Sequence, residues 1–98
     1  MNIKKNISDI INKEADAMKA IAITDAFEDA VKILFECKGR IVTTGIGKAG
    51  LMAHKFASTL SSTGTPAFFV HPAEAGHGDI GMIDRNDLIV AFSTSGKS

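Results

Sequence analysis

Apolar side chains recur every three or four positions through the first 22 residues, with charged and amide side chains between them. This spacing gathers the apolar residues on one face of an α-helix, so it predicts a long amphipathic first helix. The apolar positions are Ile3, Ile7, Ile10, Ile11, Ala15, Met18 and either Ile21 or Ala22. A second helix is predicted from about Asp25 to Cys37, because Thr24 is a suitable N-cap and Lys38-Gly39 a suitable stop.

The pattern changes after Arg40, where β-branched and apolar residues follow one another without helical spacing. Ile41–Thr44 is typical of a short buried strand that enters a glycine turn. A helix from about Lys48 to Ser62 follows. Two further apolar runs, Ala67–Val70 and Leu88–Phe92, are predicted to be strands.

The connection between the last two predicted strands, His71–Asp87, is polar and glycine-rich, and we expect one short helical turn near Asp79–Met82. This order of elements is that of a parallel α/β sheet with helices on both faces. We therefore predict a truncated three-layer αβα fold, in which two N-terminal helices precede about three strands. Residues 1–38 would form a helical lead-in, and residues 39–98 a βαβ core.

The chain ends at Ser98, directly after a predicted strand and where the next helix of such a fold would begin. Parallel sheets are normally buried, whereas three strands with an open edge expose apolar area and unpaired backbone groups. We therefore expect these 98 residues to be the N-terminal part of a single larger domain, or a chain that another chain completes.

The chain is balanced in charge, with 11 basic and 11 acidic residues and no block of either sign. This balance argues against a broad surface for nucleic acid or for a membrane. The charged N-terminus lacks the apolar core of a secretory signal, so we expect a cytoplasmic protein. Cys37 is the single cysteine, which excludes an internal disulfide and a multi-cysteine metal site. Met18, Met52 and Met82 are expected to fill core space.

A glycine turn, Gly45-Ile46-Gly47, joins the first predicted strand to the helix that starts near Lys48. Glycines let successive amides point to one spot, and a helix N-terminus adds partial positive charge, so this turn suits a phosphate or an oxyanion. The spacing is neither that of a Walker A loop nor of a clean dinucleotide fingerprint. A tight turn with a surface lysine stays open as the alternative.

Hydroxyl residues follow the last predicted strand, and they are Ser93, Thr94, Ser95 and Ser98. Hydroxyls and backbone amides around one point can bind a phosphate dianion without net positive charge. Ligands of doubly wound sheets sit at the carboxyl ends of strands, where both of these loops are expected to lie. The alternative is a disordered serine-rich tail.

The third candidate loop follows the middle predicted strand and contains His71, Glu74 and His77. These side chains could move protons or touch a metal ion. Their spacing in a glycine-rich loop matches no helical zinc motif, so we predict no metal site. His54, on the helix after the glycine turn, is expected to be a surface or half-buried residue.

The three loops together resemble the SIS (sugar isomerase) domain of the arabinose-5-phosphate isomerases of the KpsF/GutQ family. The matching segments are GIGKAG, STGTPAFFVHPAEAGHGDIGMI and FSTSGKS, against family patterns GxGKSG, STGTP-x-FFVHP-x-EA-x-HGD-x-GM and SNSGES. The resemblance covers about residues 36–98. It implies a five-stranded parallel sheet, homo-oligomers (tetramers in the full-length family) with active sites between subunits, and usually C-terminal CBS modules, which these residues do not contain.

The reaction implied by the resemblance is the interconversion of D-ribulose 5-phosphate and D-arabinose 5-phosphate through an enediol, on the route to Kdo of lipopolysaccharide or capsule. By their match to the family pattern, the residues that would bind the phosphate are Ser93, Thr94, Ser95 and Ser98. Lys48 would neutralise enediolate or phosphate charge. His77 would take part in ring opening or proton transfer. His71 and Glu74 would contact the groups that touch the substrate, or would touch a metal ion, and no cofactor is implied.

The chain departs from the family at three loop positions, where Ala49 replaces the usual Ser, Thr94 replaces Asn and Lys97 replaces Glu. The further acidic and histidine residues that the family uses lie beyond these loops and are not in this chain. We therefore predict little isomerase activity from the 98 residues alone. Three alternatives stay open: a regulatory SIS module that binds a sugar phosphate without catalysis, another SIS isomerase, and a structural role in which the chain assembles with itself through its long first helix.

Overall fold

The computed structural model describes residues 1–76 and 78–97. It divides into two compact units, Met1–Ala30 and Val31–Ser98, and each is described by itself below. Within the described residues, no helix combines the length and the apolar character needed to cross a membrane.

The N-terminal unit contains the helix α1 (Ile3–Lys19), which has the amphipathic pattern expected from the sequence. The side chain of Asn2 caps its start by accepting a hydrogen bond from the Lys5 amide at 2.9 Å. The helix ends at Lys19, two or three residues before the end of the predicted apolar stripe, and Ala20 serves as its C-cap. None of its residues is buried within the described chain.

The helix α2 (Asp25–Glu36) begins directly after Thr24, as expected, and ends one residue before the predicted Cys37. A backbone bond from the Cys37 amide to the Leu34 carbonyl, at 3.3 Å, closes its last turn. The predicted second helix is therefore confirmed to within one residue.

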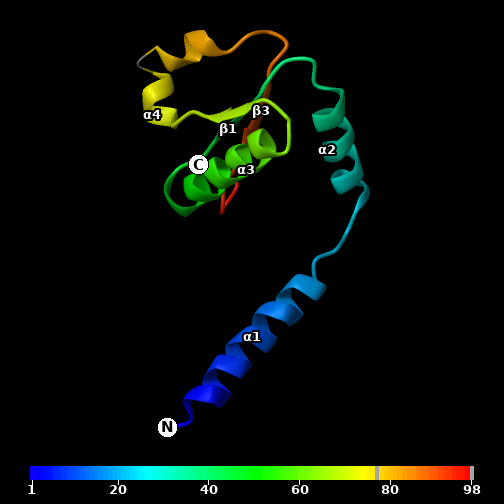
Figure 1. Ribbon diagram of the computed structural model, residues 1–98, viewed down its shortest axis with the longest axis vertical. Coiled ribbons are helices and arrows are strands. Elements are labelled where there is room, and N and C mark those ends of the chain that lie inside the picture. The colour runs from blue at the N-terminus through cyan, green and yellow to red at the C-terminus, as the bar shows by residue number, and fades with distance from the viewer. Residues whose placement is uncertain (77, 98) are drawn as a thin grey trace. The chain divides into compact units, whose positions relative to one another are not determined.

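Three strands form the sheet of the second unit: β1 (Ile41–Thr44), β2 (Ala67–Phe69) and β3 (Leu88–Ala91). All pairings are parallel, and the order is β2-β1-β3, so β1 lies in the centre (Figure 1). The central position gives β1 two neighbours, and Ile41, Val42 and Thr43 are its fully buried side chains. The three predicted strands and the truncated parallel α/β fold are confirmed, although β2 and β3 each end one residue earlier than predicted.

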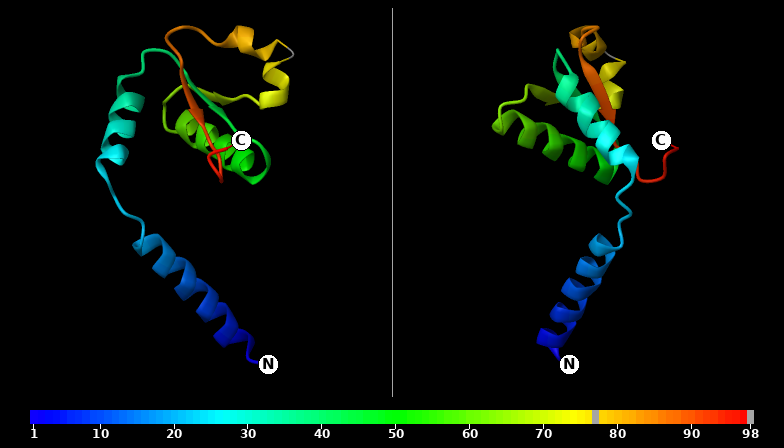
Figure 2. Two further views of the ribbon diagram at one scale, coloured as in Figure 1. Left: turned by 180° about the vertical axis from the view of Figure 1, so that it is seen from behind. Right: turned by 90° about the vertical axis from the view of Figure 1, so that its right-hand side faces the viewer.

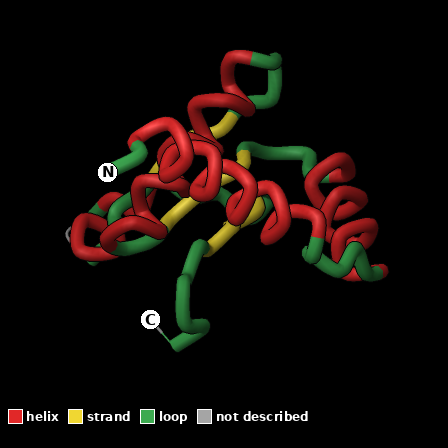
Figure 3. Tube along the Cα trace, turned by 90° about the horizontal axis from the view of Figure 1, so that it is seen from below, coloured by secondary structure: helices red, strands yellow, loops and turns green. Residues whose placement is uncertain are grey.

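The helix α3 (Gly47–Ser62) packs on one face of the sheet, against β1 and β2. Its inward positions Ala53 and Ala57 are small, which lets the helix approach the strands closely. The buried hydroxyl of Thr43 donates to the Ala53 carbonyl at 2.7 Å and ties strand to helix. Figure 3 shows this helix beside the strands.

The connection from β2 to β3 crosses the other face of the sheet and contains the short helix α4 (Pro72–Ala75) and a 3-10 turn η1 (Asp79–Met82). Right-handed crossovers in opposite directions along a parallel sheet run over opposite faces. Accordingly, α3 and the segment with α4 lie on either side of the strands (Figure 2). The helical turn at Asp79–Met82 is confirmed, whereas α4 lies in a segment that we expected to be loop.

An apolar hollow of about 250 Å³ lies between this crossover segment and the sheet. It is lined by the sheet residues Val42, Thr44 and Ile89, by Val70 directly after β2, and by Pro72, Ala75 and Ile83 of the crossover. Less helix therefore packs on this face of the sheet than on the face covered by α3.

The expectation that the methionines fill core space is wrong for Met18, Met52 and Met82, all of which are exposed. On α3 the reason is geometric. Ala53 and Ala57, four residues apart, occupy the face toward the sheet, so the adjacent Met52 is rotated toward solvent.

Arg40 and Asp87 join the start of β1 to the residues before β3. The Asp87 side chain is only 2% exposed and accepts bonds from the Arg40 amide at 2.7 Å, the Arg40 Nη2 at 3.1 Å and the Asp84 amide at 2.8 Å. These donors lower the pKa of Asp87 from 3.8 to about 2, and the backbone amides of Asp84 and then Arg40 contribute most. Arg40 Nη2 also donates to the Met82 carbonyl, and its guanidinium carbon lies 4.7 Å from the Phe68 ring centre.

Candidate functional site

The strand order places a topological switch point between β1 and β3. The chain leaves β1 toward β2 on one side and returns past β1 to reach β3 on the other. The loops after β1 and β3 therefore diverge, and a crevice opens at the carboxyl ends of these two strands, which is where doubly wound sheets bind ligands. Thr44 pairs with Ala91 at this edge, and the Phe92 amide donates to the Thr44 carbonyl at 2.9 Å.

The turn after β1 has the backbone features that suit an anion. Gly47 has a φ of 64°, a left-handed conformation that glycine adopts without strain, and it starts α3. Within the described chain, the N-cap Ile46 makes no side-chain cap bond and the first turn has no acidic residue. The first amides of α3 therefore lack a side-chain acceptor, and the exposed Lys48 stands among them.

The hydroxyl loop after β3 is ordered into turns by its own side chains. Ser93 Oγ accepts from the Gly96 amide at 2.8 Å, and Ser95 Oγ accepts from the Lys97 amide at 3.2 Å. Gly96 has a φ of 78°. In Figure 3 this loop runs from the end of β3 toward the C-terminus. Ser93, Thr94 and Ser95 are exposed, and the predicted Ser98 lies outside the described residues.

The loop after β2 positions His71 as the N-cap of α4. Its ring Nδ1 accepts a hydrogen bond from the Ala73 amide at 3.1 Å. Glu74 lies in the first turn of α4 and is exposed. His77 lies outside the described residues, so its place relative to the other loops stays a prediction. His54 is exposed, as expected, and its ring centre lies 5.2 Å from that of Phe69.

The residues at the ends of β1 and β3, together with Pro72 at the start of α4, line a hollow of about 190 Å³, which we call the loop hollow. It is lined by Thr44, Gly45, Ile46, Pro72, Ala91 and Phe92. The predicted Gly45 is part of it, and Gly47 and Ser93 each follow one of its lining residues in the chain. The other lining residues, Thr44, Ile46, Pro72, Ala91 and Phe92, were not predicted from the sequence. The signal was present, because each lies within three residues of a strand end at the carboxyl edge.

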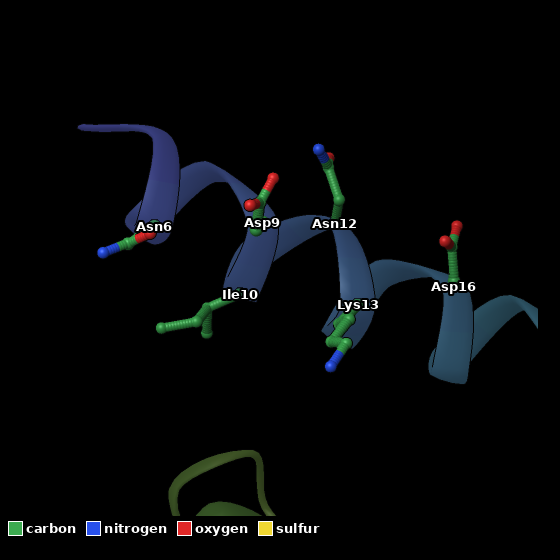
Figure 4. Close-up of a pocket in the computed structure, with 6 residues that line it drawn as sticks. All are labelled: Asn6, Asp9, Ile10, Asn12, Lys13 and Asp16. Atoms are coloured by element: carbon green, nitrogen blue, oxygen red, sulfur yellow. The ribbon is translucent and has the colours of Figure 1, made fainter. Parts of the chain in front are cut away.

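A second surface hollow lies along α1, and its lining comes from that helix alone: Asn6, Asp9, Ile10, Asn12, Lys13 and Asp16. Figure 4 shows these side chains pointing from one helix in different directions. A ligand site is concave and has convergent polar groups, so this surface is a poor candidate. Within residues 1–76 and 78–97, no three histidine, cysteine or acidic side chains are grouped to hold a metal ion.

Among curated proteins, the chain is similar to arabinose 5-phosphate isomerase KdsD of Pseudomonas aeruginosa, with 46% identity over 106 aligned positions that cover 100% of this chain and 32% of the relative. KdsD of Francisella tularensis is 54% identical over 79% of this chain and 24% of its own length. GutQ of Escherichia coli K12, also an arabinose 5-phosphate isomerase, is 56% identical over 74% of this chain and 22% of its own. The chain spans a third or less of these relatives.

Two solved structures share the fold. A proposed phosphosugar isomerase involved in capsule formation from Bacteroides fragilis superposes with a TM-score of 0.93 at 44% identity, over 99% of this chain and 53% of that one. An E. coli CFT073 protein in complex with arabinose 5-phosphate superposes with a TM-score of 0.87 at 39% identity, over 100% of this chain and 55% of that one. The SIS domain model matches residues 33–98, which hold all three strands and all three loops. The chain belongs to the SIS domain family.

Proposed function

We propose that these residues form the phosphate-binding part of an aldose–ketose isomerase that interconverts D-ribulose 5-phosphate and D-arabinose 5-phosphate. The names of the curated relatives support this reaction, and so does the similarity to a structure that contains arabinose 5-phosphate. A related SIS isomerase or a non-catalytic sugar-phosphate module has less support from these relatives.

One observation of the structure carries the proposal: the glycine turn and the hydroxyl loop flank the switch point between β1 and β3. Strands of a sheet lie about 4.8 Å apart, and Thr44 and Ala91 are direct partners, so both loops start within reach of one small ligand. One loop offers helix amides and Lys48, and the other offers hydroxyls and the amides of a turn. Together they suit a phosphate dianion.

Isomerisation moves a proton between C1 and C2 through an enediolate, so the site needs a base, a donor to the carbonyl oxygen and a grip on the distant phosphate. In this proposal Ser93, Thr94, Ser95 and Ser98 bind the phosphate. Lys48 stabilises the negative charge that develops on the enediolate or remains on the phosphate. His77 assists ring opening or proton transfer, and Glu74 lies close in the chain. No cofactor is needed.

The proposed setting is a cytoplasmic homo-oligomer, a tetramer in the full-length protein, whose product supplies Kdo for lipopolysaccharide or capsule. The balanced charge supports a small-molecule partner over nucleic acid. The structure from Bacteroides fragilis, named for capsule formation, supports the pathway by analogy.

The test is an NMR titration of the ¹⁵N-labelled chain with arabinose 5-phosphate. We expect the largest amide shifts at residues 45–48 and 93–96, and none of that size with unphosphorylated arabinose. Inorganic phosphate should shift the same amides more weakly, because it lacks the sugar contacts. Shifts confined to other segments, or equal shifts with arabinose, would contradict the proposal.

A further inference from the structure

We propose that His71 is a positioning residue: its neutral ring caps α4 and thereby holds Pro72 in the wall of the loop hollow. The inference rests on the proposed function only in taking the loop hollow as the place where a sugar phosphate binds. It gives His71 a role other than proton transfer or metal binding.

His71 provides the acceptors for the first amides of α4. Its Nδ1 accepts from the Ala73 amide at 3.1 Å, and its carbonyl accepts from the Glu74 amide at 2.9 Å and from the Ala75 amide at 3.0 Å. Its own backbone is extended, with φ −72° and ψ 133°, as N-caps are. Pro72, at the first helical position, has no amide hydrogen to satisfy.

The helix depends on this cap because it is short. An isolated helix of one turn is unstable, since ordering the backbone outweighs its few hydrogen bonds. α4 has four residues, and among the described residues none of them is buried. The interactions at its first turn therefore contribute a large share of what holds it in place.

The ring of His71 is itself fixed against the sheet. Its centre lies 6.4 Å from that of Phe69 in an edge-to-face arrangement, and Phe69 pairs with Thr43 of β1. The next residue, Val70, donates its amide to the Thr43 carbonyl at 2.8 Å and accepts from Thr44 Oγ1 at 2.6 Å. The residues that precede the cap are thus bonded to the same strand that leads into the glycine turn.

The position of Pro72 follows from the cap. Pro72 lines the loop hollow beside Thr44, Gly45 and Ile46, and it also lines the apolar hollow with Ala75. Loss of the Nδ1 bond would leave the Ala73 amide to water and loosen α4. Pro72 would then no longer be fixed opposite the glycine turn.

The cap also assigns the tautomer of His71. A neutral imidazole has one N–H and one acceptor nitrogen, so an acceptor Nδ1 leaves the proton on Nε2. Nε2 is then a donor, unable to take a proton or bind a metal ion in this arrangement. Accepting a proton would add it at Nδ1, and binding a metal ion through Nε2 would move the ring proton to Nδ1. Either change would break the bond from the Ala73 amide.

The test compares His71→Ala, His71→Asn and His54→Ala in the 98-residue chain. Asparagine is a preferred N-cap and keeps a side-chain acceptor. His54→Ala is the control, because His54 also packs on Phe69 but caps no helix. We expect His71→Ala to weaken arabinose 5-phosphate binding about fivefold and to abolish protection of the Ala73 amide from hydrogen exchange. His71→Asn and His54→Ala should stay within about twofold of wild type.

The ring ¹⁵N chemical shifts of wild-type His71, recorded at a pH at which imidazole rings are neutral, should show that Nε2 carries the proton. A protonated Nδ1, or Ala73 exchange unchanged in His71→Ala, would overturn the inference. Equal weakening in His71→Asn and His71→Ala would also overturn it. If wild type binds no arabinose 5-phosphate, the proposed function fails, while the exchange and ¹⁵N measurements still decide whether His71 is the cap.

Discussion

Gly50 lies so close to Gly45 that neither position has room for a side chain. A Cβ on Gly50 would stand 2.6 Å from the Gly45 carbonyl oxygen, and a Cβ on Gly45 would stand 3.0 Å from the Ala49 carbonyl carbon and the Gly50 amide nitrogen. Both contacts are with backbone atoms, which cannot rotate away. The first turn of α3 is therefore held directly against the strand end that carries the glycine turn.

Gly50→Ala should destabilise the chain by about 1–3 kcal/mol, the usual range for overpacking. Alanine also favours the helix over glycine by about 1 kcal/mol, which opposes this loss. If α3 could shift to make room for the added methyl group, the net destabilisation would be smaller. Urea unfolding followed by circular dichroism would measure the change.

The matched control for that substitution is Gly81→Ala, where an added Cβ meets no described atom within 4 Å. We expect it to stay within about 0.5 kcal/mol of wild type. If Gly50→Ala is as stable as the control, the close contact between α3 and the glycine turn does not constrain the fold.

Lys48→Ala should weaken arabinose 5-phosphate binding about tenfold, because a charged donor near a phosphate contributes more than a neutral one. The affinity of wild type should fall more steeply with added salt than that of the variant. Isothermal titration calorimetry at two salt concentrations would show both effects.

Lys55→Ala is the matched control for Lys48, since Lys55 is an exposed lysine of the same helix farther from its N-terminus. Its removal should leave the affinity unchanged. Similar losses from both variants would mean that α3 attracts the ligand by its general charge and not by Lys48.

Asp87 should make the stability of the second unit depend on pH in the acid range. Its pKa is lowered from 3.8 to about 2 in the folded chain, so folding favours the carboxylate. The stabilisation is present above about pH 4 and is lost as the pH falls toward 2. Asp87→Asn should lower the urea midpoint at neutral pH and flatten its dependence on pH between these values.

Asp84→Asn serves as the control for Asp87, because Asp84 is an exposed carboxylate three residues earlier in the same turn. It should keep the acid dependence of wild type. If the urea midpoint of Asp87→Asn still falls between about pH 4 and pH 2 as it does in wild type, the bonds from the Arg40 and Asp84 amides do not control stability in acid.

The 98 residues should bind arabinose 5-phosphate but turn it over little or not at all. The resemblance assigns further acidic and histidine groups to positions beyond the hydroxyl loop, and the chain covers only 53–55% of the two solved relatives described above. A coupled assay for ribulose 5-phosphate, with Pseudomonas aeruginosa KdsD as the positive control, would measure it. Robust turnover by the chain would show that these residues suffice for catalysis.

Local features were predictable because they depend on neighbours in the chain. The β-branched run at Ile41–Thr44 gave the central strand with correct ends, and the turn at Asp79–Met82 was also predicted correctly. The loops of the candidate site were found because glycine and hydroxyl residues directly follow apolar runs. α4 was missed, since its stability depends on a histidine cap, and histidine is not among the usual N-cap residues.

The sequence alone determined the helices α1, α2 and α3 and the three strands, because apolar spacing and turn residues act over a few positions. Only the tertiary structure decided the order β2-β1-β3, and with it the switch point where the glycine turn and the hydroxyl loop flank one crevice. Thr44 and Ala91 are register partners, and the backbone bond that joins their strands here runs from the Phe92 amide to the Thr44 carbonyl, which nothing in the side-chain pattern indicates. The bond from Arg40 to Asp87 likewise became visible only once β1 and β3 were neighbours.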